Sequence, residues 1–289
     1  MNDYINSIYW KKIHLSGCGE LRKVGHPFLS EELNHLKYAS EEDSVLFCLG
    51  KTLGEFGRMG RTELSVMDVG AGTGYWSGLV MDFCGAQGFN VSLKAVDIST
   101  DALESIQKRY GSVETFCTDI KSIDPEHFIQ SYDLVISFYC LHHLVNLNHF
   151  LNGLRFSGYS VRSGGYLYIM DPVLSMPFSP FNTIDFPSYK GNGIPRHLYL
   201  IDDELSQQGF ARQHVLPAVS FLINGPIEGS GRLSYALTSR IWLRMSAVYR
   251  SGWWVQRLSW ILGRVDKLLK RKGFSFSSSI CVYRKVSTD

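Results

Sequence analysis

Two adjacent histidines, His142 and His143, follow a strongly apolar run in the segment FYCLHHLVN. A neutral imidazole, whose unperturbed pKa is about 6.5, can take a proton from an alcohol or a phenol near neutral pH. The same side chains could instead ligate a metal ion, or pack as a corner of the core with their N–H groups bonded to the backbone. The pair alone leaves all three roles open.

An acid and a further histidine could act with this pair. Asp171 ends the apolar segment GGYLYIMD, where a carboxylate could orient an imidazole ring. His197 follows a long loop rich in proline, glycine and serine, and is either a further candidate base or a loop histidine at a helix entry. Adjacent histidines at a helix start diverge, and with one acid they fall short of the ligands that zinc needs, so a metal site is disfavoured.

A glycine run, VMDVGAGTGYW, places Gly70, Gly72 and Gly74 directly after an apolar segment. A strand, a glycine turn and a helix can bring backbone N–H groups close to a ligand, although the same turn also occurs without one. The dinucleotide fingerprint G-x-G-x-x-G requires glycine where Tyr75 stands, so nicotinamide binding is disfavoured.

Two acids end the next apolar runs of the chain. Asp97 closes VSLKAVD and Asp119 closes VETFCTD. A carboxylate at such a position either binds a ligand or caps the helix that follows the strand.

These residues need a parallel sheet to bring them together. From residue 64 on, short apolar runs alternate with helical stretches, which predicts βαβ units in an α/β fold. The predicted strands cover 64–70, 91–97, 113–119, 132–138, 164–171, 211–219 and 277–286. Since the carboxyl ends of parallel strands meet at one edge, the glycine run, the acids and the histidine pair should share one crevice.

Together the motifs resemble the class I, Rossmann-like, S-adenosylmethionine-dependent methyltransferases. Asp68 stands two residues before the first glycine, as in the first motif of that family, and YDLVISFYCLHHL resembles its fourth motif. The resemblance spans about 60–172 in motifs and 60–286 in element order. It implies a seven-stranded, mostly parallel sheet with helices on both faces and the last strand antiparallel between strands five and six.

The resemblance also implies a site. S-adenosyl-L-methionine, with S-adenosyl-L-homocysteine as product, would be held by Asp68, Gly70, Ala71, Gly72, Gly74, Trp76, Asp97, Ile98, Asp119, Ile120, Ser137 and Phe138. In the family, the acid after the second strand binds the ribose hydroxyls and the acid after the third meets the adenine amino group. The candidate catalytic residues are His142, His143, Asp171 and His197, with one histidine of the pair expected to be catalytic and the other structural.

The leading function is O-methylation of a hydroxyl with a histidine as general base, as in small-molecule and sugar O-methyltransferases that carry a His-His pair. The LHHL pattern does not fix the acceptor atom, so C- or N-methylation of a small metabolite such as a quinone precursor, or cofactor binding without turnover, are the alternatives. The motifs of base-amino, cytosine and protein-arginine methyltransferases are absent. A small-molecule, glycan or lipid-linked acceptor is expected, and no nucleic acid.

Charge and periodicity divide the 289 residues into three regions. We expect an N-terminal helical cap over 1–62, which is either a lid or a dimer contact, a methyltransferase domain over 63–222 and 274–289, and a basic, tryptophan-rich helical insertion over 223–273. The net charge is +2, yet residues 224–273 hold ten basic and two acidic residues. Residues 240–272 could lie on an anionic membrane surface, pack as a cap, contact a phosphorylated soluble substrate, or form the interface of a homodimer.

Cysteine usage and hydropathy bear on location. The six cysteines have no C-x-x-C spacing, and no run of 18 apolar residues occurs. Neither a disulfide framework nor a membrane span is predicted. We therefore expect a cytoplasmic protein that could be peripheral at the membrane.

Overall fold

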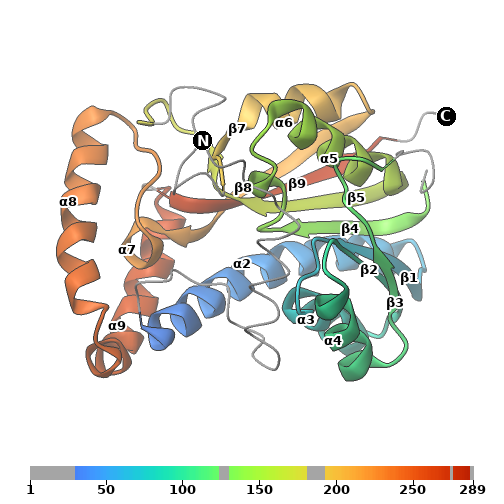
Figure 1. Ribbon diagram of the computed structural model, residues 1–289, viewed down its shortest axis with the longest axis horizontal. Coiled ribbons are helices and arrows are strands. Elements are labelled where there is room, and N and C mark those ends of the chain that lie inside the picture. Colours follow the sequence, from blue (N-terminus) through green and yellow to red (C-terminus); the bar gives the residue numbers. More distant parts are fainter. Residues whose placement is uncertain (1–29, 124–129, 181–192, 274–275, 287–289) are drawn as a thin grey trace.

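The computed structural model describes residues 30–123, 130–180, 193–273 and 276–286, and it has a central sheet of seven strands. Their order across the sheet is β3-β2-β1-β4-β5-β9-β8 (Figure 1). The strands are β1 (Glu63–Val69), β2 (Asn90–Asp97), β3 (Glu114–Cys117), β4 (Tyr132–Phe138), β5 (Val161–Asp171), β8 (Phe210–Ser220) and β9 (Phe276–Lys285). The predicted α/β class and all seven predicted strands are confirmed.

The pairing within the sheet is parallel except at β9. Strands β1 to β5 pair in parallel, and β9 runs antiparallel to both β5 and β8. This confirms that the last strand inserts between the fifth and sixth of the sheet. The strand order reverses between β1 and β4, and a crevice at that reversal is where open α/β sheets bind their ligands.

Helices cover both faces of the sheet (Figure 1). Helices α2, α3 and α4 pack on one face and α5 and α6 on the other. Their bounds are α2 (Glu31–Arg58), α3 (Tyr75–Ala86), α4 (Thr100–Tyr110), α5 (Leu147–Ser160) and α6 (Leu198–Ser206). Helix α6 ends at Ser206, ahead of Gly209, which has a φ of +81°.

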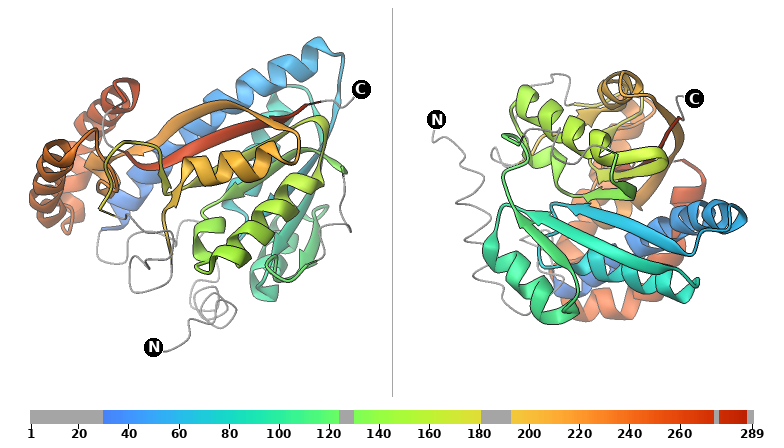
Figure 2. Two further views of the ribbon diagram at one scale, coloured as in Figure 1. Left: turned by 90° about the horizontal axis from the view of Figure 1, so that it is seen from above. Right: turned by 90° about the vertical axis from the view of Figure 1, so that its right-hand side faces the viewer.

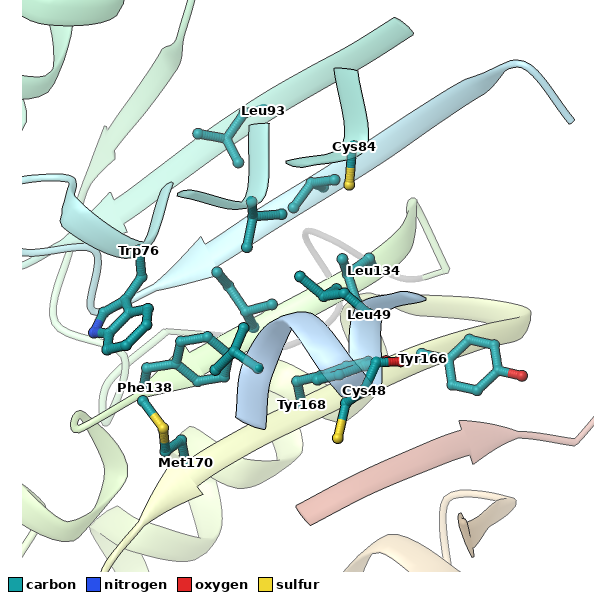
Figure 3. Close-up of a cluster of buried hydrophobic side chains, with 14 of the residues drawn as sticks. Cys48, Leu49, Trp76, Cys84, Leu93, Leu134, Phe138, Tyr166, Tyr168 and Met170 are labelled. Carbon is teal, nitrogen blue, oxygen red and sulfur yellow. The ribbon is translucent and has the colours of Figure 1, made fainter. Parts of the chain in front are cut away.

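The core follows from the alternation of side chains along the strands. In β5, Tyr166 and Tyr168 face the α2 side while Leu167 faces α5 and α6, and all three are buried. In Figure 3, Tyr168 lies beside Cys48 of α2. Its hydroxyl is 2.6 Å from Thr52 Oγ1 and donates to the Cys48 carbonyl at 3.1 Å, so the polar end of this ring is satisfied.

The basic segment forms a helical lobe at one end of the molecule (Figures 1 and 2). Helix α7 (Phe221–Asn224) leads into it, and it contains α8 (Arg232–Val248) and α9 (Gly252–Arg271). Buried Asp266 of α9 accepts hydrogen bonds from Ser40 Oγ of α2 and, at 2.9 Å, from the Ser220 amide. No helix in the described ranges is long and apolar enough to cross a membrane.

The long loop after Asp171 is only partly within the described residues. It contains two short parallel strands, β6 (Val173–Leu174) and β7 (Arg196–His197). Residues 1–29 of the expected N-terminal cap and residues 181–192 of the loop lie outside the described residues.

Candidate functional site

The glycine loop between β1 and α3 has a geometry that only glycine adopts easily. Gly70, Gly72 and Gly74 have φ angles of +76°, +54° and +87°. A Cβ atom on Gly70 would lie 2.3 Å from the Cys140 sulfur, and one on Gly74 would lie 2.7 Å from Ile106 Cγ1. The loop therefore approaches the end of β4 more closely than a side chain would allow.

Asp97 holds the glycine loop from the end of β2. Its Oδ2 accepts a hydrogen bond from the Gly72 amide and its Oδ1 accepts one from the Ser99 amide, both at 2.9 Å. The carboxylate is buried but borders a cavity, so it both shapes the loop and faces the space above it.

A cavity that is open to solvent on one side lies at the carboxyl ends of β1, β2 and β4. The carboxyl ends of parallel strands are where open α/β sheets bind small ligands. Nine of the twelve predicted cofactor residues line it, namely Gly70, Ala71, Gly72, Trp76, Asp97, Ile98, Asp119, Ile120 and Phe138. The sheet edge thus brings together residues that are widely separated in the sequence.

Three predicted cofactor residues, Asp68, Gly74 and Ser137, do not line the cavity. Asp68 lies beneath the first turn of α3, where it accepts a hydrogen bond from Ser77 Oγ at 2.6 Å, and burial raises its pKa to about 7. Gly74 packs against α4, and Ser137 is fully buried in β4. These three residues therefore stabilise the glycine loop and β4, and they do not form part of the cavity wall.

Asp119 lies at the rim of the cavity, just beyond β3. Its Oδ2 is 2.8 Å from Lys121 Nζ, and about a quarter of its side chain is exposed. The acid is therefore held by a neighbouring cation and is open to solvent on one side.

Other lining residues were not predicted from the sequence: Tyr38, Thr73, Tyr75, Thr118, Cys140 and Leu144. Tyr38 belongs to α2, and its ring centroid is 4.7 Å from that of Tyr75 and 5.7 Å from that of Trp76. Helix α2 thus contributes a wall of the cavity. Thr73 and Tyr75 had a sequence signal, because they lie inside the glycine motif, whereas Tyr38 had none.

The histidine pair begins just after β4, in a short 3₁₀ turn over Leu141–His143. His142 Nδ1 is 2.6 Å from Asp171 Oδ1, and the ring centroids of His142 and His143 are 3.9 Å apart. His143 lines the cavity, whereas His142 and Asp171 lie behind it. The structure therefore gives the two histidines different surroundings.

Burial sets the protonation of the His142–Asp171 pair. Burial lowers the pKa of His142, which keeps its imidazole neutral near pH 7, and it raises the pKa of Asp171. Asp171 Oδ2 is buried and has no hydrogen-bond partner in the described residues. When Asp171 is ionised, it accepts a hydrogen bond from Nδ1–H of His142, and Nε2 is then the ring nitrogen that can accept a proton. When Asp171 is protonated, it donates to Nδ1 and Nε2 carries the proton of the imidazole.

Tyr139 links this pair to α2. Its φ of +53° is unusual for a residue other than glycine. Its hydroxyl donates to the buried Glu41 carboxylate and lies 2.7 Å from Ser278 Oγ, while Lys37 Nζ lies 4.1 Å from its ring centroid. A strained backbone next to a cavity is typical of functional sites.

His197 is not brought to the cavity. It ends β7 and its ring stacks on Tyr199 with a centroid distance of 5.4 Å. Gly193 lies beside the pair instead, since a Cβ atom there would be 2.9 Å from His142 Cδ2. In the part of the chain that the structure describes, no three His, Cys, Asp or Glu side chains cluster as metal ligands.

Comparison with known proteins finds similarity in the central part of the chain. Residues 66–156 match the family model described as a methyltransferase domain. The non-reducing polyketide synthase dpfgA of Gibberella zeae is 31% identical over 153 residues, and subA of Metarhizium robertsii is 33% identical over 89 residues. These stretches cover 47% and 28% of this chain, but the chain spans only 7% and 4% of the relatives' length.

Solved structures resemble the chain at the level of the fold. A putative sarcosine dimethylglycine methyltransferase from Galdieria sulphuraria is 13% identical, covering 82% of this chain and 84% of its own, with a TM-score of 0.48.

Proposed function

We propose that the protein is an S-adenosylmethionine-dependent methyltransferase whose His142–Asp171 pair activates the acceptor. The observation that carries the proposal is the cavity at the switch point of the sheet, bounded by the glycine loop and Asp97, within the matched methyltransferase domain. Its donor and acceptor groups fit the cofactor, because carboxylates can bind ribose hydroxyls and Trp76 and Tyr38 supply flat apolar walls.

The chain's own groups would position and deprotonate the acceptor. When bound, the cofactor supplies an electrophilic methyl group from a sulfonium centre, which becomes a neutral thioether as the methyl group is transferred. When ionised, Asp171 accepts a hydrogen bond from Nδ1–H of His142, so that Nε2 can take the proton of an acceptor that reaches past His143 as the new bond to the methyl carbon forms. His143, on the cavity wall, would help to orient the acceptor.

A base is needed only for acceptor atoms that lose a proton when they are methylated, which narrows the classes of acceptor. A hydroxyl of a small molecule, glycan or lipid-linked compound must lose its proton on methylation, which makes O-methylation the first candidate. The similarity to polyketide synthases favours a second candidate, an acidic carbon between two carbonyl groups, as polyketide chains contain. The same pair could remove either proton, so it does not distinguish the two.

The test has two stages. Calorimetry should show binding of S-adenosylhomocysteine but not of NAD, and a chain that binds neither would refute the cofactor assignment. Methyl transfer from labelled cofactor to phenolic and to β-ketoacyl thioester probes would then separate oxygen from carbon acceptors. Binding without transfer to any probe would favour the non-catalytic alternative.

Separate His142→Ala and His143→Ala variants identify the base. We expect the first to lose turnover at unchanged cofactor affinity, and the second to change mainly the KM for the acceptor.

A further inference from the structure

Exposed apolar side chains are concentrated on α8 and α9. Among the described residues, ten of the fifteen large hydrophobic side chains that are exposed lie on these two helices: Leu233, Leu237, Ile241, Leu243, Trp253, Trp254, Trp260, Ile261, Val265 and Leu268. We call the surface formed by these ten residues the α8–α9 face. The other five are scattered singly, as is normal for a protein surface.

One side of helix α9 packs against the rest of the protein. Val255, Leu262 and Asp266 are buried towards α2 and α7. In the sequence, apolar side chains recur at helical spacing at Trp254, Leu258, Ile261, Val265 and Leu268. Leu258 packs against the buried cluster, whereas the other four are exposed. The helix therefore packs as a cap through a different stripe from the one that hydrophobic periodicity indicates.

Tryptophan and arginine alternate along the outer side of α9. The Arg257 guanidinium lies 4.1 Å from the Trp253 ring centroid, and that of Arg264 lies 3.8 Å from the Trp260 ring centroid. Trp253 and Trp260 are 51% and 64% exposed. Large rings with a polar edge beside a flat cation are suited to the boundary between lipid headgroups and acyl chains.

The exposed charges that residues 224–273 contribute are all positive, although Glu32 and Asp43 of α2 lie beside α9. Residues 224–273 hold ten basic and two acidic residues, and both acids, Glu228 and Asp266, are buried. On α8, Arg240 and Arg244 lie on the same exposed side as Leu237 and Ile241. A positive apolar surface of this kind complements an anionic bilayer, whereas a neutral one would leave the arginines without counter-charges.

We propose that the α8–α9 face docks on an anionic phospholipid bilayer, with both helices lying in the plane of the interface. The tryptophans and leucines enter the headgroup region, and the arginines on either side contact lipid phosphates. This proposal concerns the surface alone and does not rest on methyl transfer. The carboxyl ends of β4 and β5 point towards the same end of the molecule (Figure 1), so docking would bring the cavity near the lipid.

The experiment is vesicle flotation with the full chain. We expect it to float with vesicles of phosphatidylcholine mixed with phosphatidylglycerol, and not with phosphatidylcholine alone, with tryptophan emission shifted to the blue. Arg257→Gln combined with Arg264→Gln should weaken partitioning about 25-fold, from about fivefold per charge. Trp253→Ala combined with Trp260→Ala should weaken it and reduce the emission shift.

A matched control removes two charges elsewhere. Lys108 and Arg109 are exposed on α4, at a distance from the lobe, and the Lys108→Gln, Arg109→Gln variant should float as the unmodified chain does. Flotation that stays at background with anionic lipid, or an equal loss in the control variant, would overturn the proposal. So would light scattering that shows a dimer which the tryptophan variant converts to a monomer, because the face would then bind a second copy.

Discussion

Replacing Asp97 by asparagine separates the two roles that the structure gives this carboxylate. Its oxygens accept from the Gly72 and Ser99 amides at 2.9 Å, so it holds the loop as well as facing the cavity. Alanine would leave both buried amides unpaired, at about 1–3 kcal/mol each, and would confound folding with binding. Asparagine keeps one acceptor oxygen in place.

The expected loss can be worked out for each role. The Asp97→Asn variant would lose one backbone hydrogen bond, so we expect its free energy of unfolding to fall by about 1–3 kcal/mol. Loss of a charged acceptor for a ribose hydroxyl costs about 1.5–3 kcal/mol of binding, which raises the Kd for S-adenosylhomocysteine about 10- to 150-fold. Calorimetry measures the second quantity and urea unfolding the first.

Asp101→Asn is the matched control, since it removes the same charge from the first turn of the neighbouring helix and does not border the cavity. It should leave the Kd unchanged. If Asp97→Asn binds S-adenosylhomocysteine within about twofold of the original chain while its stability falls as expected, Asp97 only shapes the loop, and the inference that it binds the ribose is wrong.

Four further predictions concern residues around the cavity. Asp171→Asn should lower kcat about 10²- to 10⁴-fold at unchanged cofactor affinity, because the amide can donate to Nδ1 of His142 and so leave the ring proton on Nε2, which then cannot act as a base. Equal turnover would refute the pairing. Because Nε2 can accept a proton only when Asp171 is ionised, and burial raises the pKa of Asp171 to about 8, the acid limb of a kcat profile against pH should lie above the value of about 6.5 for a free imidazole, and a limb below it would contradict this. Gly70→Ala should lower the free energy of unfolding by about 2–5 kcal/mol, as thermal melting would show, because its φ is positive and its Cβ would meet Cys140; an unchanged melting temperature would argue against the close approach. Burial raises the pKa of Asp68 to about 7, above its unfolded value of about 4, so the stability present below pH 4 should be lost as the pH rises through 7. Asp68→Asn should flatten this slope between about pH 5 and about pH 7, as urea titrations would measure, and an equal slope in the two proteins would count against it.

The parts of the site that the sequence predicted are those set by local chemistry. Gly70 and Gly72 need positive φ angles within a turn of a few residues, and Asp97 is placed by the end of its own strand. The alternation of apolar runs then brings such strand ends to one edge, whatever the packing of the surrounding helices.

The parts that the sequence did not predict depend on contacts between distant segments. Tyr38 and Glu41 reach the site from a helix whose partners at Tyr139 and Ser278 are far away in the chain. His197 was expected at the cavity because it follows a long loop, but its position is set by pairing with β6.

Helix α9 shows why amphipathic patterns can mislead. Its buried stripe includes Asp266, a polar residue that is satisfied by Ser40 and the Ser220 amide. Hydrophobic periodicity therefore favours the wrong side of the helix, because the pattern cannot register a buried acid that finds its partners in another element.

Helix α2 contacts both the helical lobe and the cavity, so it connects the three regions that the sequence predicts. One of its sides carries Leu33 and Ser40 onto the lobe of α7 to α9, while another carries Tyr38 and Glu41 to the cavity and its neighbouring tyrosine. Because one helix contacts both, we expect excision of residues 223–273 to destabilise the side of the cavity to which Tyr38 belongs, which faster amide exchange along α2 would show. Unchanged exchange in α2 would mean that the lobe and the cavity are independent.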